Sequence, residues 1–175
     1  MRILQLWATL PSASRWAAPR FEHIARENAP VRQEPGIEAR VYSGTSGGVR
    51  APSHTHLPMT MTDVWLAPNA LFEQELPLSY NGFLYPLRGE LLVDGRSPQR
   101  LSVGHIGWLE FGRPSTTIRL TAGNEGSRVM LYAGERQDVP IVTYGPFVGE
   151  SRADLVRVSQ AYAEGRMPRI SELGR

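Results

Sequence analysis

The chain has 175 residues, of which 41% are apolar and 21% charged, as in an ordinary globular protein of about one domain. This composition excludes collagen, coiled coil and wholesale disorder. Nineteen basic residues, all of them arginine, oppose seventeen acidic residues and leave a net charge of +2. Because the arginines are scattered along the chain and form no block, we expect no direct contact with nucleic acid.

The absence of cysteine excludes disulfides, thiolate metal sites and cysteine nucleophiles. No apolar run approaches the ~20 residues that a transmembrane helix needs, so we expect no membrane association. The first residues resemble a signal peptide, but Gln5 interrupts their apolar stretch and Pro11 ends it early. We therefore interpret them as part of the fold and expect a cytoplasmic protein.

Residues 1–36 are predicted to form an arm with little regular structure. This segment holds several prolines and one short polar stretch, residues 20–28, that is long enough for a helical turn or two. Its aromatic side chains Trp7, Trp16 and Phe21 would be exposed to water if the arm stood alone. We therefore expect the arm to lie on the rest of the fold.

Residues 40–145 are dense with short strand signals separated by glycine and proline, which predicts a mainly β sandwich or small barrel. Within this section, residues 43–48 read as a flexible glycine-rich loop, and Asp94-Gly95 predicts a tight type I′ hairpin. Pro86 removes a ladder donor inside an apolar strand, which indicates a sheet edge or a bulge. The predicted strands are 40–42, 59–66, 71–76, 82–87, 90–93, 106–109, 116–121, 128–132 and 141–144.

A short amphipathic helix is predicted to close the chain. Ser151 is a suitable N-cap, with Asp154 three residues on as its capping-box partner. Leu155, Val158 and Tyr162 then fall on one face at helical spacing, and Gly165 supplies a helix stop. We interpret this helix as a structural closure of the fold.

Several strings resemble a known family. The segment 81–90 looks like the glycine-ended strand and turn of cupin barrels. Residues 144–148, Tyr-Gly-Pro-Phe-Val, with Ala-Gly-Glu at 133–135 before them and the helix ending at 161–166 after them, are similar to the carboxy-terminal half of the pirin family. Residues 4–11 resemble the pirin segment that links its two cupin barrels.

The resemblance implies a single cupin-type β-barrel, or double-stranded β-helix, with an N-terminal arm and a short C-terminal helix. On this reading 1–36 is the linker-like arm, 37–148 the carboxy-terminal-type barrel, and 149–175 the helix and tail. Pirins hold their metal, usually iron, in the amino-terminal barrel through three histidines and a glutamate. This chain resembles the part that begins at the linker, so the metal-bearing barrel is not represented in it.

Alignment with the cupin metal motifs, anchored at Gly89, keeps the turn residues but loses the ligands. The opening glycine becomes Asn69, the residue next best suited to a left-handed turn, and the glutamate position falls on Gly82. The histidine of the second motif falls on Ser115. The histidine positions of the first motif fall, in two alignments, on Glu75 and Pro77 or on Leu76 and Leu78. We therefore expect no cofactor in the ordinary cupin site.

His54-Thr-His56 is the alternative candidate for a metal site. If this segment were a strand, both imidazoles would point to one face and could share a metal, with His105 or a carboxylate completing the site. Thr55 to Pro58, however, match a string common in the carboxy-terminal barrel of pirins. We therefore interpret His56 as a structural hydrogen-bonding residue and His54 as its surface neighbour, and we assign no catalytic, cofactor or metal residue.

The sequence is compatible with three functional hypotheses. The first is a pirin-like, metal-free binding or protein-interaction module, assembled as a homo-oligomer or with a metal-bearing cupin partner and with an unknown small-molecule ligand, if any. The second is an iron-dependent dioxygenase of the quercetinase type that uses His54 and His56. The third is a remnant, or a separately encoded half, of a two-barrel pirin.

Overall fold

A computed structural model describes residues 3–95, 97–109 and 116–173 of the protein. The chain divides into two compact units. The β unit spans residues 24–136, and the terminal unit combines residues 1–23 with residues 137–175.

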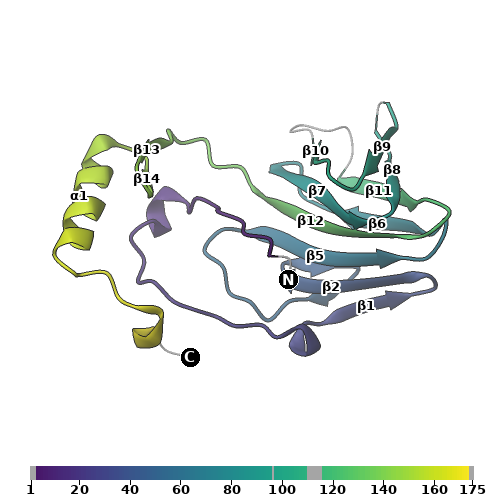
Figure 1. Ribbon diagram of the computed structural model, residues 1–175, viewed down its shortest axis with the longest axis horizontal. Coiled ribbons are helices and arrows are strands. Elements are labelled where there is room, and N and C mark those ends of the chain that lie inside the picture. The colour runs from purple at the N-terminus through teal and green to yellow at the C-terminus, as the bar shows by residue number, and fades with distance from the viewer. Residues whose placement is uncertain (1–2, 96, 110–115, 174–175) are drawn as a thin grey trace. The chain divides into compact units, whose positions relative to one another are not determined.

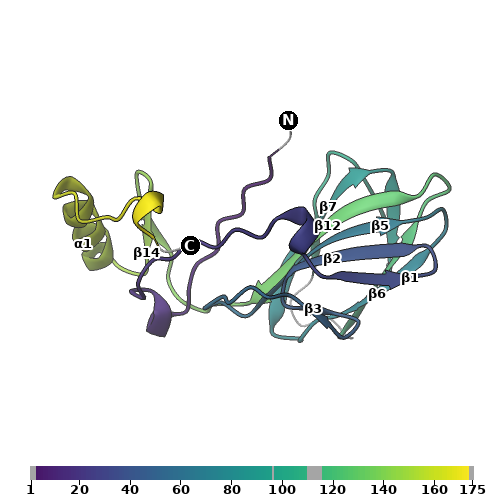
Figure 2. The same ribbon diagram turned by 90° about the horizontal axis from the view of Figure 1, so that it is seen from below.

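The β unit consists mainly of two antiparallel sheets, as the sequence predicts (Figure 1). The larger sheet has the strand order β1-β2-β5-β12-β7-β10, and the smaller has the order β6-β11-β8-β9. Figure 2 shows β1, β2 and β5 side by side in the larger sheet. The strands are β1 (Val31–Glu34), β2 (Ile37–Ser43), β3 (Thr45–Ser46), β4 (Val49–Arg50), β5 (Met59–Leu66), β6 (Leu71–Glu75), β7 (Tyr80–Arg88), β8 (Glu90–Val93), β9 (Gln99–Ser102), β10 (Gly107–Leu109), β11 (Thr117–Ala122) and β12 (Ser127–Glu135).

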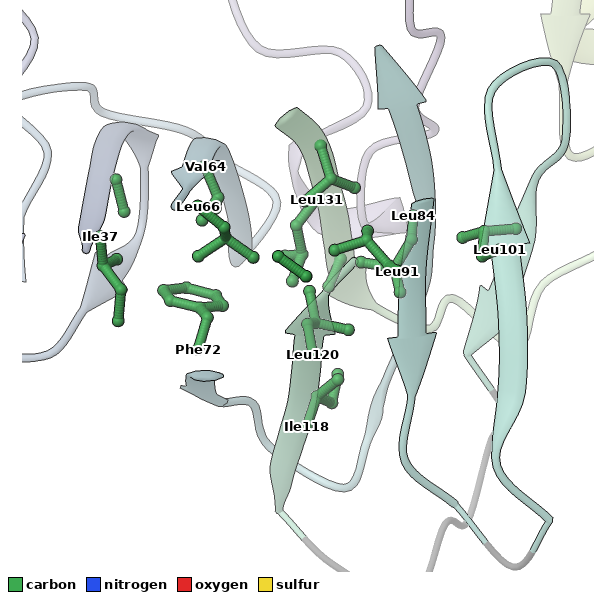
Figure 3. Close-up of a cluster of buried hydrophobic side chains, with 14 of the residues drawn as sticks. Ile37, Val64, Leu66, Phe72, Leu84, Leu91, Leu101, Ile118, Leu120 and Leu131 are labelled. Carbon is green, nitrogen blue, oxygen red and sulfur yellow. The ribbon is translucent and has the colours of Figure 1, made fainter. Parts of the chain in front are cut away.

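The core lies between the two sheets. Alternate residues of β2 and β6 are buried, because successive side chains of a strand point to opposite faces of its sheet. Figure 3 shows Phe72 of β6 beside Val64 and Leu66 of β5, with the leucines of β7, β8 and β12 farther along the same interior. The interior is therefore filled by leucine, valine, isoleucine and phenylalanine, apart from a few buried polar side chains.

The turn predictions are confirmed at two positions. Asn69 adopts a φ of +58° between β5 and β6, the conformation that the family's glycine would take, and no other non-glycine residue in the described ranges has a positive φ. Pro86 lies opposite Val129 next to a register shift between β7 and β12, which is the predicted bulge. Pro86 also lies beyond the residues of β7 that pair with β10, so no ladder bond to β10 is lost there.

Two loop predictions are corrected. Residues 45–50 are the short hairpin β3–β4 and not a flexible loop. Arg32 fixes this hairpin because its Nη1 donates to Ser46 Oγ at 3.2 Å, and the Ser46 side chain is buried. The Asp94-Gly95 hairpin exists, but its loop runs from 94 to 98 and Gly95 has no positive φ. Val93 of β8 pairs with Gln99 of β9, so the connection is longer than the two residues of a type I′ turn.

The terminal unit holds the predicted helix, α1 (Arg152–Ala163), and a hairpin of β13 (Val142–Tyr144) and β14 (Phe147–Gly149) (Figure 2). The capping box between Ser151 and Asp154 is present. A 3₁₀ turn at Ser12–Ser14 joins this unit because Arg15 forms a 2.7 Å ion pair with Glu150. The guanidinium of Arg157 lies 3.8 Å from the ring centroid of Trp16.

Two further 3₁₀ turns, Arg26–Asn28 and Ile170–Glu172, complete the regular structure. The first lies in the polar stretch for which a helical turn was predicted. None of the helices in the described part of the chain is long and apolar enough to cross a membrane.

The units divide the chain at different residues from the predicted segments 1–36, 37–148 and 149–175. The sheet already begins with β1, which lies within the predicted arm. This strand was not predicted because its sequence Arg-Gln-Glu is polar. Residues 137–148 belong with α1 because β14 and the helix pack together.

Candidate functional site

Among the described residues, the positions where the resemblance places metal ligands hold no imidazole and no buried carboxylate. Leu76 is 1% exposed within the apolar core, whereas Glu75 points out to solvent. Gly82 has no room for a side chain, because a Cβ there would overlap the backbone carbonyl oxygen of Tyr132. Ser115, at the remaining histidine position, lies outside the described residues. The described ligand positions therefore do not fit the family's iron, which prefers imidazole and carboxylate donors.

The three histidines weighed as metal ligands are all exposed. His54 and His56 lie in the irregular segment between β4 and β5, so the strand geometry that would aim both rings to one side is absent. His105 lies in the turn before β10, with its Nδ1 3.3 Å from Ser102 Oγ. In residues 3–95, 97–109 and 116–173, no three His, Cys, Asp or Glu side chains are grouped to hold a metal ion.

A buried ion pair on the outer face of the larger sheet was not predicted from the sequence. Asp63 of β5 is 2% exposed, and Arg128 of β12 donates to both of its carboxylate oxygens, at 2.9 and 2.7 Å. The Arg128 guanidinium also lies 4.4 Å from the ring centroid of Trp65. The hydrogen bonds to Asp63 raise the pKa of Arg128, so this cation stays charged. A single carboxylate inside a strand of mostly apolar residues was the available signal for such a pair.

An aromatic row crosses the same face where β5, β12, β7 and β10 lie side by side. The register aligns Met61 with Tyr132, Tyr132 with Phe83, and Phe83 with Trp108. The Phe83 ring is 4.9 Å from Tyr132 and 5.4 Å from Trp108, between centroids. Burial, and then the charge of Asp63, raise the pKa of Tyr132, so this phenol stays protonated. At the β10 end of the row, Trp108 is 74% exposed.

Most of the exposed large apolar side chains lie in the terminal unit, although the β unit is the larger of the two. Trp7 is 68% exposed in the arm and Tyr144 is 70% exposed in the β13–β14 hairpin. The others in this unit are Ile3, Leu4, Leu6, Trp16, Phe21, Ile141, Val148, Val156, Tyr162 and Met167. Exposed apolar side chains that gather into one patch are typical of a protein-interaction site.

A family model described as the pirin C-terminal cupin domain matches residues 61–168. Pirin-1 of Arabidopsis thaliana is 31% identical over 155 residues, which are 87% of this chain and 53% of that protein. Across the first curated relatives that it matches, the chain spans only about half to three fifths of their length.

Two solved structures agree with this match. The structure of GK1651 from Geobacillus kaustophilus is 37% identical and has a TM-score of 0.69 over 75% of this chain and 53% of that one. A structure of quercetin 2,3-dioxygenase from Acinetobacter baumannii has a TM-score of 0.79 over 92% of this chain and 55% of that one. Its identity of 22% supports a shared fold.

Proposed function

Since this chain belongs to the pirin family, we propose that it acts as a protein-binding module that holds no metal of its own. Its fold is the mainly β cupin architecture, with a short C-terminal helix. The partner we propose is a second copy of this chain, which makes the functional form a homodimer. A separate chain that carries a metal-bearing cupin barrel is the alternative partner.

The observation that carries this proposal is the exposed apolar surface of the terminal unit. Trp7 and Tyr144 expose more than two thirds of their area, and burying apolar area yields roughly 25 cal/mol per Å². The arm is also anchored, since Arg15 and Ser12 both contact the Glu150 carboxylate. An anchored segment loses less conformational entropy on binding than a free one, which favours association.

A dioxygenase of the quercetinase type is the second candidate, because a structural relative carries the name quercetin 2,3-dioxygenase. That reading needs iron ligands, and the chain offers His54, His56 and His105 in two exposed loops. A likeness of fold does not transfer an active site. The third candidate, half of a two-barrel pirin, accords with the chain's coverage of about half of its relatives.

Association is tested by sedimentation velocity of the full chain over a range of concentrations. We expect a mass near twice 19.5 kDa, and a Trp7→Ser variant with at least tenfold weaker association. Trp108→Ser is the matched control, because Trp108 is equally exposed but lies in the β unit. A 19.5 kDa monomer at every concentration would contradict the homodimer, and a mass increase only on mixing with a metal-bearing cupin barrel would favour the alternative partner.

Metal content separates the binding module from the dioxygenase. The protein is purified without a metal-affinity tag, and iron, nickel, zinc, copper and manganese are measured per chain before and after reconstitution. We expect far less than one metal ion per chain in both samples. Nearly one ion per chain, lost in the His54→Ala or His56→Ala variant, would support the dioxygenase instead.

A further inference from the structure

The interior between the sheets contains two buried polar side chains whose oxygens have no protein partner. Thr62 of β5 is 0% exposed and Gln74 of β6 is 2% exposed. Within the described part of the chain, neither Thr62 Oγ1 nor Gln74 Oε1 has a hydrogen-bond partner. A buried polar atom without a hydrogen bond destabilises the fold, so two of them in one core require an explanation.

The orientation of the Gln74 amide is fixed by its own hydrogen bonds. Its Nε2 donates to the backbone carbonyl of Thr45 at 3.0 Å and to that of Glu75 at 2.8 Å. Both amide hydrogens are therefore used, and rotating the amide would place its oxygen against two carbonyl oxygens. The Oε1 atom remains as an acceptor that needs a donor.

The two orphan oxygens lie at neighbouring inward positions of the core. Phe72 lies beside Val64 and Leu66 in Figure 3. The next inward position along β6 from Phe72 is Gln74, and the next along β5 from Val64 is Thr62, because inward residues alternate.

The hydrogen bond of Gln74 to Thr45 places its amide on the same side of the core as Thr62. Thr45 follows Gly44, where an added Cβ would lie 2.7 Å from Thr60 Oγ1. Thr60 is the inward residue of β5 next to Thr62. The Gln74 side chain therefore reaches across from the smaller sheet toward the β2–β5 part of the larger one.

We propose that one buried water molecule binds between Thr62 Oγ1 and Gln74 Oε1 and joins the two sheets at this point. The water accepts the hydroxyl proton of Thr62 and donates to the amide oxygen of Gln74, which satisfies both orphan atoms. Charged ligands do not suit the site, because its two orphan atoms belong to neutral side chains.

The first test is a high-resolution crystal structure of the full chain. We expect electron density for one water within hydrogen-bonding distance of both oxygens. A core that is empty at this point, or a direct bond between Thr62 and Gln74, overturns the proposal.

The second test is the Thr62→Val variant, which keeps the shape of the side chain and removes the hydroxyl. Bound water would lose a partner, so we expect the unfolding equilibrium constant to rise about tenfold relative to a Thr121→Val control on the outer face of β11. Without the water, removing an unbonded hydroxyl would leave the protein equally or more stable, and that result would overturn the proposal.

The third test is a double-mutant cycle with Gln74→Met. The two substitutions remove the same water, so their combined effect on the unfolding equilibrium constant should be clearly less than the product of the single effects. The cycle also cancels the loss of the Gln74 bond to Thr45, which occurs with or without the hydroxyl of Thr62. Strictly multiplicative effects would show that the two side chains share no ligand.

Discussion

Replacing Asp63 by asparagine should destabilise the β unit far more than replacing an exposed member of another ion pair. Asp63 is almost fully buried and receives two hydrogen bonds from Arg128, whose side chain is 30% exposed. Breaking a fully buried pair costs roughly 3–5 kcal/mol. Water can reach part of the Arg128 guanidinium, so we expect about 2 kcal/mol for Asp63→Asn, against a typical total of roughly 5–15 kcal/mol.

Urea unfolding followed by circular dichroism measures this loss. With a slope of about 2 kcal/mol per M, the midpoint should fall by about 1 M. Arg128→Met should cost more than Asp63→Asn, because it leaves a carboxylate that is only 3% exposed without its cation. Glu73→Gln is the control, since Glu73 and Arg119 pair on the surface and such pairs contribute under about 1 kcal/mol. If Asp63→Asn shifted the midpoint no more than Glu73→Gln does, the pair would not stabilise the fold.

Three further outcomes can be measured. Gly82→Ala should lower the free energy of unfolding by about 3 kcal/mol or more, because the added Cβ overlaps the β12 backbone. Gly95→Ala is the control: its added Cβ meets no close atom, so this variant should be near neutral in the same urea titration. Asn69→Ala should cost about 1 kcal/mol for its left-handed φ and Asn69→Gly almost nothing; equal midpoints for the two variants would refute this reason. Desolvation acts to raise the pKa of Asp154, but hydrogen bonds from the backbone N–H groups of residues 150 and 151 and from the Ser151 side chain outweigh it and hold the pKa below 3.8. The cap of α1 should therefore be at full strength above about pH 4 and be lost as the pH falls through the lowered pKa, and Asp154→Asn should abolish this dependence in an NMR titration of the helix.

The strands that could be predicted from the sequence are those with an apolar or β-branched residue pattern of their own. β5 and β8 have the predicted bounds, because apolar and β-branched residues mark them. β1 and β9 were not predicted, since their polar sequences Arg-Gln-Glu and Gln-Arg carry no such pattern and only pairing with β2 and β8 makes them strands. The 45–50 hairpin was misjudged because distant residues fix it, namely Arg32 and Gln74.

The candidate site also combines features that the sequence indicates with features that it does not. The loss of the cupin ligands stays a prediction, which rests on the identities of Leu76 and Gly82 at the aligned positions. The sequence does not reveal that the chain between β4 and β5 is irregular. It therefore could not show that His54 and His56 do not alternate along a strand. The Asp63–Arg128 pair depends on the register of strands 65 residues apart in sequence, which no local pattern contains.

The terminal unit has a consequence for folding during synthesis. Residues 12–16 leave the ribosome well before their partners in this unit, Glu150 and Arg157. At about 5–20 residues per second, the interval between them is of the order of ten seconds. Throughout that interval the apolar side chains of the arm have no native partner in their own unit. A nascent arm of this kind would be a binding site for chaperones, and pulse proteolysis of stalled chains should find it protected only after residue 157 has emerged.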